Sequence, residues 1–186
     1  MKTYRSGFPR WRPGWWCLAF FCTCASLHAE VSKEYQLKAA FLFNFTKFVE
    51  WPAQRFADDS APIIIGILGE NPFGDELETI VRNRTVNGRG IVVRRLSSAS
   101  EARGVHMVFV SATEEKRFNE LKDLLPASGT VVVSEITANA RGSGVIVFTL
   151  KGDQVRFEID QDAAERTGVK ISAQLLKLAT VVRKKA

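Results

Sequence analysis

The segment QLKAAFLFNFTKFVEWP, residues 36–52, carries four phenylalanines and one tryptophan, and its apolar spacing predicts one long helix. Ser32 is suited to be the N-cap, and Pro52 disfavours helical geometry at Trp51, so both ends of the helix are marked. The apolar positions fill an arc wider than a helix on an open surface needs, so we expect a largely buried helix that the rest of the chain covers. That arc holds Leu37, Ala40, Phe41, Leu42, Phe45, Phe48 and Val49.

Two residues of this helix break the pattern. Asn44 falls among the apolar side chains, which predicts a buried amide satisfied by backbone groups in preference to a ligand-binding residue. Phe43 falls on the polar side, beside Lys47 and Glu50. An isolated exposed aromatic is ordinary on a protein surface, and contact with a partner is the alternative interpretation.

The N-terminus has the features of a secretory signal peptide, residues 1–29. Basic residues precede an apolar run at residues 15–27, and the first acid is Glu30. The run is shorter than the roughly 20 residues that span a bilayer. We therefore expect cleavage after Ala29 and export, with one domain formed by residues 30–186. A retained membrane anchor and a lipidated cysteine are the less favoured alternatives.

Loss of this leader changes how the composition is interpreted. All three cysteines precede residue 30, so the expected mature chain forms no disulfide, although a chain of this length can bury roughly 70% of its unfolded surface without one. Four cations leave with the leader, so the formal net charge of +6 does not indicate nucleic-acid binding. The remaining basic groups, residues 82–95 and 183–185, are expected to be solvated surface.

Beyond residue 60, apolar strands alternate with amphipathic helices. The continuous apolar run IIIGILG, residues 63–69, is typical of a strand buried on both faces of a parallel sheet. This alternation predicts an α/β fold with right-handed crossovers. Further strands are predicted at residues 91–96, 106–110 and 130–134, and helices at residues 75–81 and 113–125.

The last third of the chain departs from that alternation. Two β-forming runs, residues 145–150 and 155–159, flank a Gly-containing turn and predict an antiparallel hairpin. A short helix capped by Asp160 and stopped by Gly168 follows, and Ser172 begins a final helix with the stripe Ile171, Leu175, Leu178 and Val182. The predicted fold is a Rossmann-like or flavodoxin-like three-layer α/β domain, with a mostly parallel mixed sheet, helices on both faces and this hairpin near the C-terminus.

Residues that would carry chemistry are scarce. His106 is the only histidine after the leader and lies in an apolar strand, which favours a core imidazole over a catalytic one. A Cys–His pair, a zinc site of ordinary composition and a G-x-S-x-G elbow are all missing from the sequence after residue 29. Gly69 and Gly74 have P-loop spacing, but the acids Asp75 and Glu76 follow where Lys and Ser/Thr are needed. We expect no cofactor and no catalytic residue.

Four segments together resemble the YfiR family of periplasmic proteins. They are FNFTKFVEWP at residues 43–52, ILGENPF at 67–73, VRFEI at 155–159 and GVKISAQLLKLA at 168–179. The resemblance covers nearly the whole expected mature chain, and none of the four segments is a catalytic signature.

This resemblance implies a non-enzymatic regulator. The best-known member represses an inner-membrane diguanylate cyclase through the periplasmic domain of the cyclase, and an OmpA-like outer-membrane lipoprotein sequesters the repressor. By analogy, this protein is expected to lower cyclic di-GMP synthesis and biofilm formation from the periplasm, and to form a homodimer, without binding nucleic acid. In that family an apolar patch formed by the C-terminal part contributes to partner binding, which implies the candidate partner-binding residues Phe157, Ile159, Val169, Ile171 and Leu175. Phe43, the aromatic on the polar side of the first helix, and Trp51, at its end, are two further candidates.

Alternatives remain open both for the candidate residues and for the function. For each candidate residue, plain core packing is the simpler interpretation. For the protein, the second function is a periplasmic small-molecule sensor with an apolar pocket near Trp51 and the final helix, and the third is an exported enzyme that uses only Asp and Ser. One departure is clear, because characterised relatives form disulfides that this cysteine-free mature chain cannot form.

Overall fold

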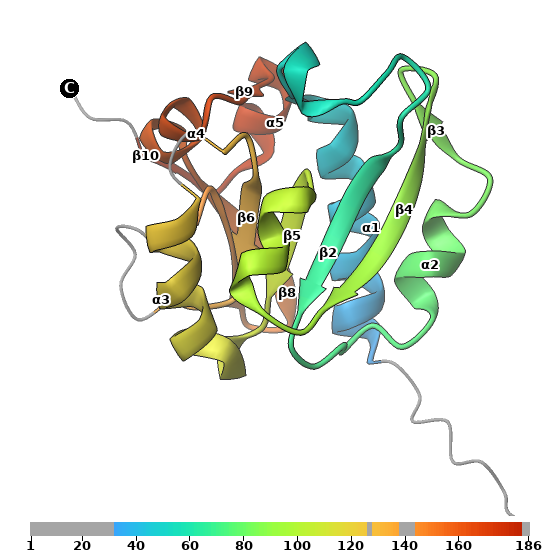
Figure 1. Ribbon diagram of the computed structural model, residues 1–186. Helices are drawn as coiled ribbons and strands as arrows, with labels where there is room; N and C mark the ends of the chain where they lie inside the picture. The colour runs from blue at the N-terminus through green and yellow to red at the C-terminus, as the bar shows by residue number, and fades with distance from the viewer. Residues whose placement is uncertain (1–31, 126–127, 138–143, 184–186) are drawn as a thin grey trace, which may run out of the picture.

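A computed structural model describes residues 32–125, 128–137 and 144–183. It is a three-layer α/β structure in which helices cover both faces of a mixed eight-stranded sheet (Figure 1). The helices are α1 (Lys33–Phe48), α2 (Glu76–Val81), α3 (Glu115–Leu124), α4 (Gln161–Thr167) and α5 (Ala173–Leu178), with the 3-10 helices η1 (Ala53–Arg55), η2 (Ala99–Gly104) and η3 (Ala112–Glu114). The strands are β1 (Val49–Glu50), β2 (Ile63–Leu68), β3 (Thr85–Val86), β4 (Arg89–Leu96), β5 (Met107–Val110), β6 (Val131–Ser134), β7 (Ile146–Lys151), β8 (Gln154–Asp160), β9 (Lys170–Ile171) and β10 (Val181–Arg183).

The large sheet has the strand order β10-β8-β7-β6-β5-β2-β4-β3. The strands from β4 to β7 in this order are parallel, β7 and β8 form an antiparallel hairpin, and β3 pairs antiparallel with β4. The predicted fold class is therefore confirmed. Strands β5 and β6 are buried along their whole lengths, as expected of parallel strands covered on both faces.

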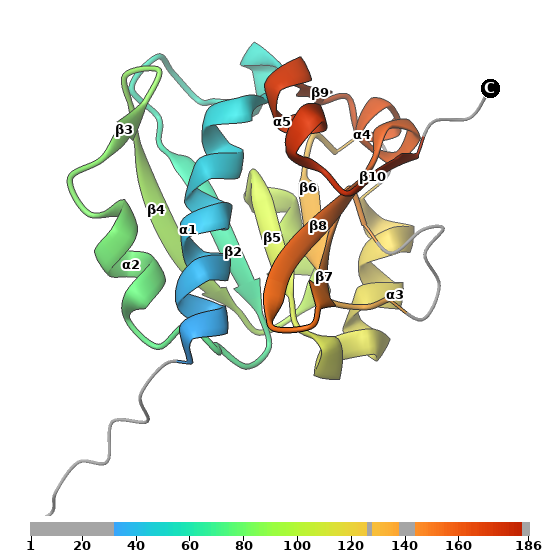
Figure 2. The same cartoon turned by 180° about the vertical axis from the view of Figure 1, so that it is seen from behind.

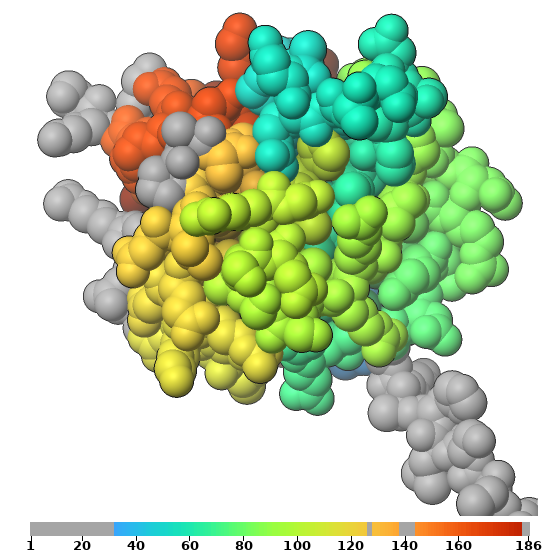
Figure 3. Space-filling view, in the orientation of Figure 1, coloured from blue at the N-terminus to red at the C-terminus, as the bar shows by residue number. Residues whose placement is uncertain are grey.

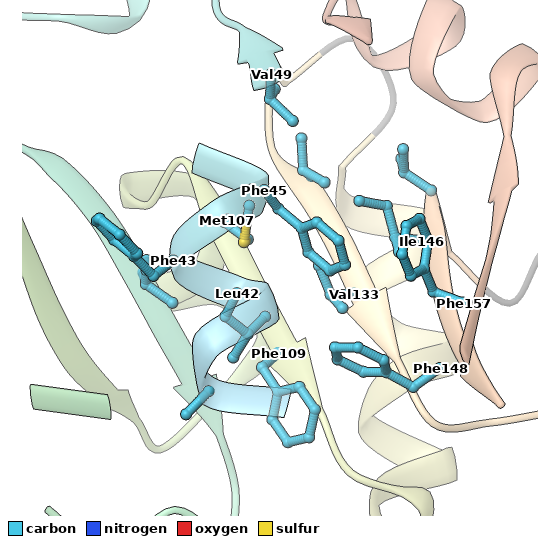
Figure 4. Close-up of a cluster of buried hydrophobic side chains, with 14 of the residues drawn as sticks. Leu42, Phe43, Phe45, Val49, Met107, Phe109, Val133, Ile146, Phe148 and Phe157 are labelled. Atoms are coloured by element: carbon cyan, nitrogen blue, oxygen red, sulfur yellow. The ribbon is translucent and has the colours of Figure 1, made fainter. Parts of the chain in front are cut away.

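The core lies in two clusters, one on each side of the sheet. Figure 2 shows α1 crossing the middle of one face, with α2 beside it. In this cluster the Phe45 ring packs against Phe157 at a centroid distance of 5.0 Å and against Phe148 at 5.8 Å (Figure 4). On the other face, η2 and α3 cover Leu68, Val108 and their neighbours, and Figure 3 shows this side of the molecule.

The first helix ends earlier than the sequence predicts. It stops at Phe48, and Val49 already has an extended backbone, with φ −104° and ψ 130°. Val49 and Glu50 form β1, which pairs antiparallel with β9, and the Ser172 N–H donates to the Phe48 carbonyl at 2.9 Å. A strand pairing with a distant segment, and not Pro52, therefore ends the helix.

The buried face of α1 is also rotated from the predicted arc. Leu37 is 45% exposed, whereas Phe43 is only 6% exposed, because α2 packs on the side of the helix that Phe43 occupies. Figure 4 shows Phe43 and Phe45 pointing to different sides of α1. Lys47 and Arg84 lie over the Phe43 ring, at 4.3 and 4.9 Å from its centroid. The prediction of an exposed Phe43 was wrong.

Asn44 also differs from its prediction. It is only partly buried, and its Oδ1 accepts a hydrogen bond from Lys47 Nζ at 3.2 Å, one helical turn further on. The partner of the amide oxygen is thus the side chain of an exposed lysine and not a backbone group. The same shift of the buried face towards Phe43 accounts for the position of Asn44 near solvent.

The final helix is shorter than predicted. It ends at Leu178, and residues 181–183 form β10, which pairs parallel with β8 at the edge of the sheet. The Thr180 N–H donates to the Phe157 carbonyl at 2.8 Å and begins this pairing. The predicted stripe therefore divides among three elements: β9 holds Ile171, α5 holds Leu175 and Leu178, and β10 holds Val182.

The predicted caps are confirmed. Ser32 accepts from the Tyr35 N–H, Asp160 from the Ala163 N–H and Ser172 from the Leu175 N–H. Gly168 has φ +82° and ends α4 in the left-handed conformation. These local signals place four helix boundaries, because each depends on neighbouring residues alone.

A hairpin before β4 was missed in the sequence. Asn87 and Gly88 have φ values of +51° and +79°, the conformation of a tight two-residue turn, and they join β3 to β4. Among the described residues, no helix is long and apolar enough to cross a membrane.

Candidate partner-binding surface

Four of the candidate partner-binding residues lie in the core. Phe157, Ile159, Val169 and Leu175 are each no more than 3% exposed, and all four belong to the cluster beneath α1. Phe43 joins them on its own side of that helix. In this structure these side chains therefore belong to the hydrophobic core and are not part of the molecular surface, as the core-packing interpretation expects.

Trp51 and Ile171 are only half-buried and lie where β1 meets β9. Val49 is the register partner of Ile171, and Trp51 follows two residues later. The Trp51 Nε1–H donates to the His106 carbonyl at 3.0 Å, which fixes the indole at the amino-terminal edge of β5. Among the candidate residues, these two contribute directly to the surface.

The most exposed apolar residues of the C-terminal region were not among the candidates. Leu178 is 65% exposed, and Val181 and Val182 are each 40% exposed. The two valines lie on β10, which ends the sheet order and pairs only with β8 among the described residues. The available signal was the β-branched run at residues 180–182, which favours a strand over a helix.

This surface, defined by Leu178, Val181 and Val182 and called the β10 edge below, combines apolar side chains with an open strand edge. An open edge offers backbone N–H and C=O groups that another chain can pair with. At its end, Arg183 forms an ion pair with Glu158 of β8, so β10 is held to the sheet on its inner side. The arrangement suits binding of another polypeptide.

A cluster of aromatic and basic residues surrounds His106. The imidazole is 4% exposed, lies against Phe56 with a ring centroid distance of 4.5 Å, and contacts the edge of Trp51 at 5.7 Å. Its Nδ1 accepts a hydrogen bond from the Ile64 N–H at 3.1 Å. Burial, and secondarily the positive charge of Arg55, lowers the pKa of His106 to about 4. The ring is therefore neutral at pH 7 and links β5 to β2.

Arg55 secures η1 against this cluster. Its guanidinium donates to the Val105 carbonyl at 2.6 Å and to the Arg103 carbonyl at 3.3 Å. Burial lowers the pKa of Arg55 from its usual value. Arg55 thus holds η1 to the backbone segment that leads into the amino-terminal end of β5.

A second polar cluster lies at the opposite, carboxyl-terminal ends of β5 and β6. The ammonium of Lys38 is buried and forms ion pairs with Glu34 and Glu135, and the Tyr35 hydroxyl donates to Glu135 Oε2 at 3.3 Å. Burial, followed by the charge of Glu135, raises the pKa of Tyr35 to about 12. This cluster was not predicted from the sequence, although Glu34 and Lys38 have the i, i+4 spacing of an ion pair.

Ligands of open α/β sheets usually bind at these carboxyl-terminal ends. Here the charges of Lys38, Glu34 and Glu135 are already directed at one another, and the Ala112 N–H also donates to Glu135 at 3.3 Å. The cluster therefore joins α1 to the segment after β6. In the described part of the chain, no three His, Cys, Asp or Glu side chains are grouped as metal ligands would be.

Comparison with known proteins gives a match to a family model. Residues 35–180 match the family model described as YfiR/HmsC-like. The matched segment begins within α1 and ends just before β10. No curated protein matches the sequence significantly.

Proposed function

Because this chain belongs to the YfiR/HmsC-like family, we propose that it is a periplasmic, non-enzymatic regulator that represses an inner-membrane diguanylate cyclase. It would bind the periplasmic domain of the cyclase and so lower cyclic di-GMP levels and biofilm formation. The family assignment supports the regulatory class and the cyclase partner.

The observation that carries the binding mode is the β10 edge. Leu178, Val181 and Val182 are the exposed apolar residues of the C-terminal segment, and β10 is the terminal strand in the order of the large sheet among the described residues. We propose that a segment of the partner pairs along β10 or packs on these side chains. Trp51 and Ile171 would extend the contact from the neighbouring β1–β9 pair, whereas Phe43, Phe157, Ile159, Val169 and Leu175 would support it from the core.

The required energy sets the size of the interface. Driving a two-state cyclase from mostly active to mostly inactive takes a binding preference of about 5.5 kcal/mol for one state. A protein interface of standard size, roughly 800 Å² on each partner, is able to supply it. Three exposed side chains are too few for that area, so the β10 edge would form the centre of a larger contact.

The proposal extends to the rest of the signalling system by the same analogy. A signal peptide, residues 1–29, would direct the remaining domain to the periplasm. An OmpA-like outer-membrane lipoprotein would compete for the regulator, and the regulator would form a homodimer.

The test combines deletion and complementation. Deletion of the gene is expected to raise cyclic di-GMP, and the wild-type gene to restore it. Leu178→Glu and Val182→Glu are expected to fail in complementation, because a buried charge at the centre of an interface is costly. Leu150→Glu is the matched control, since Leu150 is 56% exposed but lies at the tip of the β7–β8 hairpin.

Three measurements decide the outcome. Cyclic di-GMP is quantified in each strain, periplasmic levels of each variant are compared by immunoblot, and binding to the purified periplasmic domain of the cyclase is measured directly. Cyclic di-GMP that stays unchanged on deletion in every growth condition contradicts the regulatory function. Normal repression by both β10-edge variants contradicts the binding mode only.

A second candidate function, the small-molecule sensor, is favoured by two hollows in the structure. One is an apolar cavity between α3 and α4, and the other lies between α4 and β9 and is lined in part by Val169 and Ile171. Of the two, the hollow beside β9 is closer to the predicted site near the final helix. Thermal-shift measurements with amino acids and vitamins test this function, and a flat response would exclude those ligands.

A further inference from the structure

We propose that the apolar cavity between α3 and α4 binds a single acyl chain with an anionic head group, such as a medium-chain fatty acid. This inference does not depend on the cyclase or on the β10 edge. It rests on the volume of the cavity, the residues that line it and the charges at its rim.

The cavity lies at the seam between the two core clusters. Phe118, Leu121, Leu125 and Val132 come from the cluster beneath α3, whereas Val145 and Ala163 come from the cluster beneath α1. In Figures 1 and 3, α3 and α4 lie one above the other on the same side of the molecule.

The volume and lining select the class of ligand. The cavity measures about 240 Å³. Apolar cavities of about 150 Å³ stay dry and bind benzene, so by proportion this one has room for about ten carbons. Water would find few hydrogen-bonding partners against the six apolar side chains, whereas an alkyl chain would regain the dispersion contacts that the void lacks.

The basic residues at the rim of the cavity favour a ligand with a negatively charged head group. Lys122 and Arg166 line the cavity from α3 and α4, and no acidic side chain lines it among the described residues. Lys122 lies across the Phe118 ring, with its Nζ 5.3 Å from the ring centroid, so its alkyl stem follows the apolar wall while its charge stays near solvent. Because both cations line the same cavity, a carboxylate or phosphate at the head of the ligand would have a cationic partner there.

The experiment measures binding of decanoate and of decanol to the chain of residues 30–186 by isothermal titration calorimetry, with decanoate below its critical micelle concentration and decanol below its solubility limit. Decanoate is expected to bind at one equivalent. The double variant K122A/R166A is expected to bind decanoate about tenfold more weakly, because it loses two partly exposed charge pairs, and to bind decanol as the wild type does. Lys116→Ala is the matched control, since Lys116 is exposed on α3 but does not line the cavity.

A second variant tests the cavity itself. Ala163→Leu extends a side chain into the void and is expected to abolish binding of both compounds, with circular dichroism and a thermal melt to verify folding. Decyl phosphate, in place of decanoate, separates a phosphate-bearing lipid from a free fatty acid as the favoured ligand, and tighter binding of either supports the class. Decanoate binding that A163L leaves unchanged, binding that K122A/R166A leaves unchanged, or no binding at all overturns the proposal.

Discussion

Lys38 of the first helix and Glu135, which directly follows β6, form a buried ion pair across 97 positions of sequence. The Lys38 side chain is 5% exposed and that of Glu135 is 8% exposed, so neither charge has ready access to water. A charge buried in this way is tolerated because its partner is present. The pair joins the N-terminal helix to the carboxyl-terminal end of the parallel sheet.

Lys38→Met is expected to destabilise the protein by about 3–5 kcal/mol, because it leaves the carboxylate of Glu135 buried without its cation. The double variant K38M/E135Q is expected to recover at least half of that loss, since the remaining amide is neutral. Urea denaturation measures both. Lys33→Met, an exposed lysine at the start of the same helix, is the control. A K38M protein within 1 kcal/mol of wild type would contradict a stabilising role for the pair.

His106 is expected to make stability fall in mild acid. Its pKa is about 4 in the folded protein, below the roughly 6.5 of an unfolded chain, so the unfolded state binds the proton first as the pH drops. The contribution is complete above pH 6.5, declines from pH 6.5 to 4, and amounts to no more than about 3 kcal/mol.

The measurement is the free energy of unfolding of residues 30–186 between pH 7 and 4, where His106 is the only histidine. In His106→Phe the slope over this range is expected to be shallower, whatever constant loss follows from removing the acceptor of the Ile64 N–H. Parallel pH profiles for the two proteins would show that His106 does not carry the effect.

Tyr35 is expected to act in the opposite direction at high pH. Its pKa of about 12 lies above the usual value of 10, so the folded state retains the phenolic proton and loses stability as the pH rises from 10 to 12. Tyr35→Phe removes this contribution, so the stability difference between wild type and Y35F narrows over that range. Denaturation curves of both proteins at pH 9 and at pH 11 measure this stability difference. A stability difference between wild type and Y35F that is the same at both pH values would contradict a raised pKa of Tyr35 in the folded protein.

Two apolar residues of α1 that share one predicted face are expected to differ sharply. Phe45 is fully buried against Phe148 and Phe157, so Phe45→Ala is expected to cost about 3–5 kcal/mol. Leu37 is 45% exposed, so Leu37→Ala is expected to change stability by less than about 1 kcal/mol. Thermal and urea denaturation measure both variants. Equal losses of stability in the two variants would support the buried face that helical periodicity predicted.

The sequence by itself determined the fold class, the family and most helix starts. Continuous apolar runs in β2 and β5 indicate strands buried on both faces, and the caps Ser32, Asp160 and Ser172 bond to N–H groups only three residues away. These signals are local, because a strand or a cap is specified by its immediate neighbours and their hydrogen-bonding needs.

Only the tertiary structure decided which residues meet across long separations. Helix α1 ends at Phe48 because β9 pairs with β1, and Phe43 is buried because α2 covers it. Val181 and Val182 form a strand because β8 provides a free edge for pairing. Helical periodicity places residues around one axis but does not say which side the neighbours will cover, so the partner-binding surface had to be found in three dimensions.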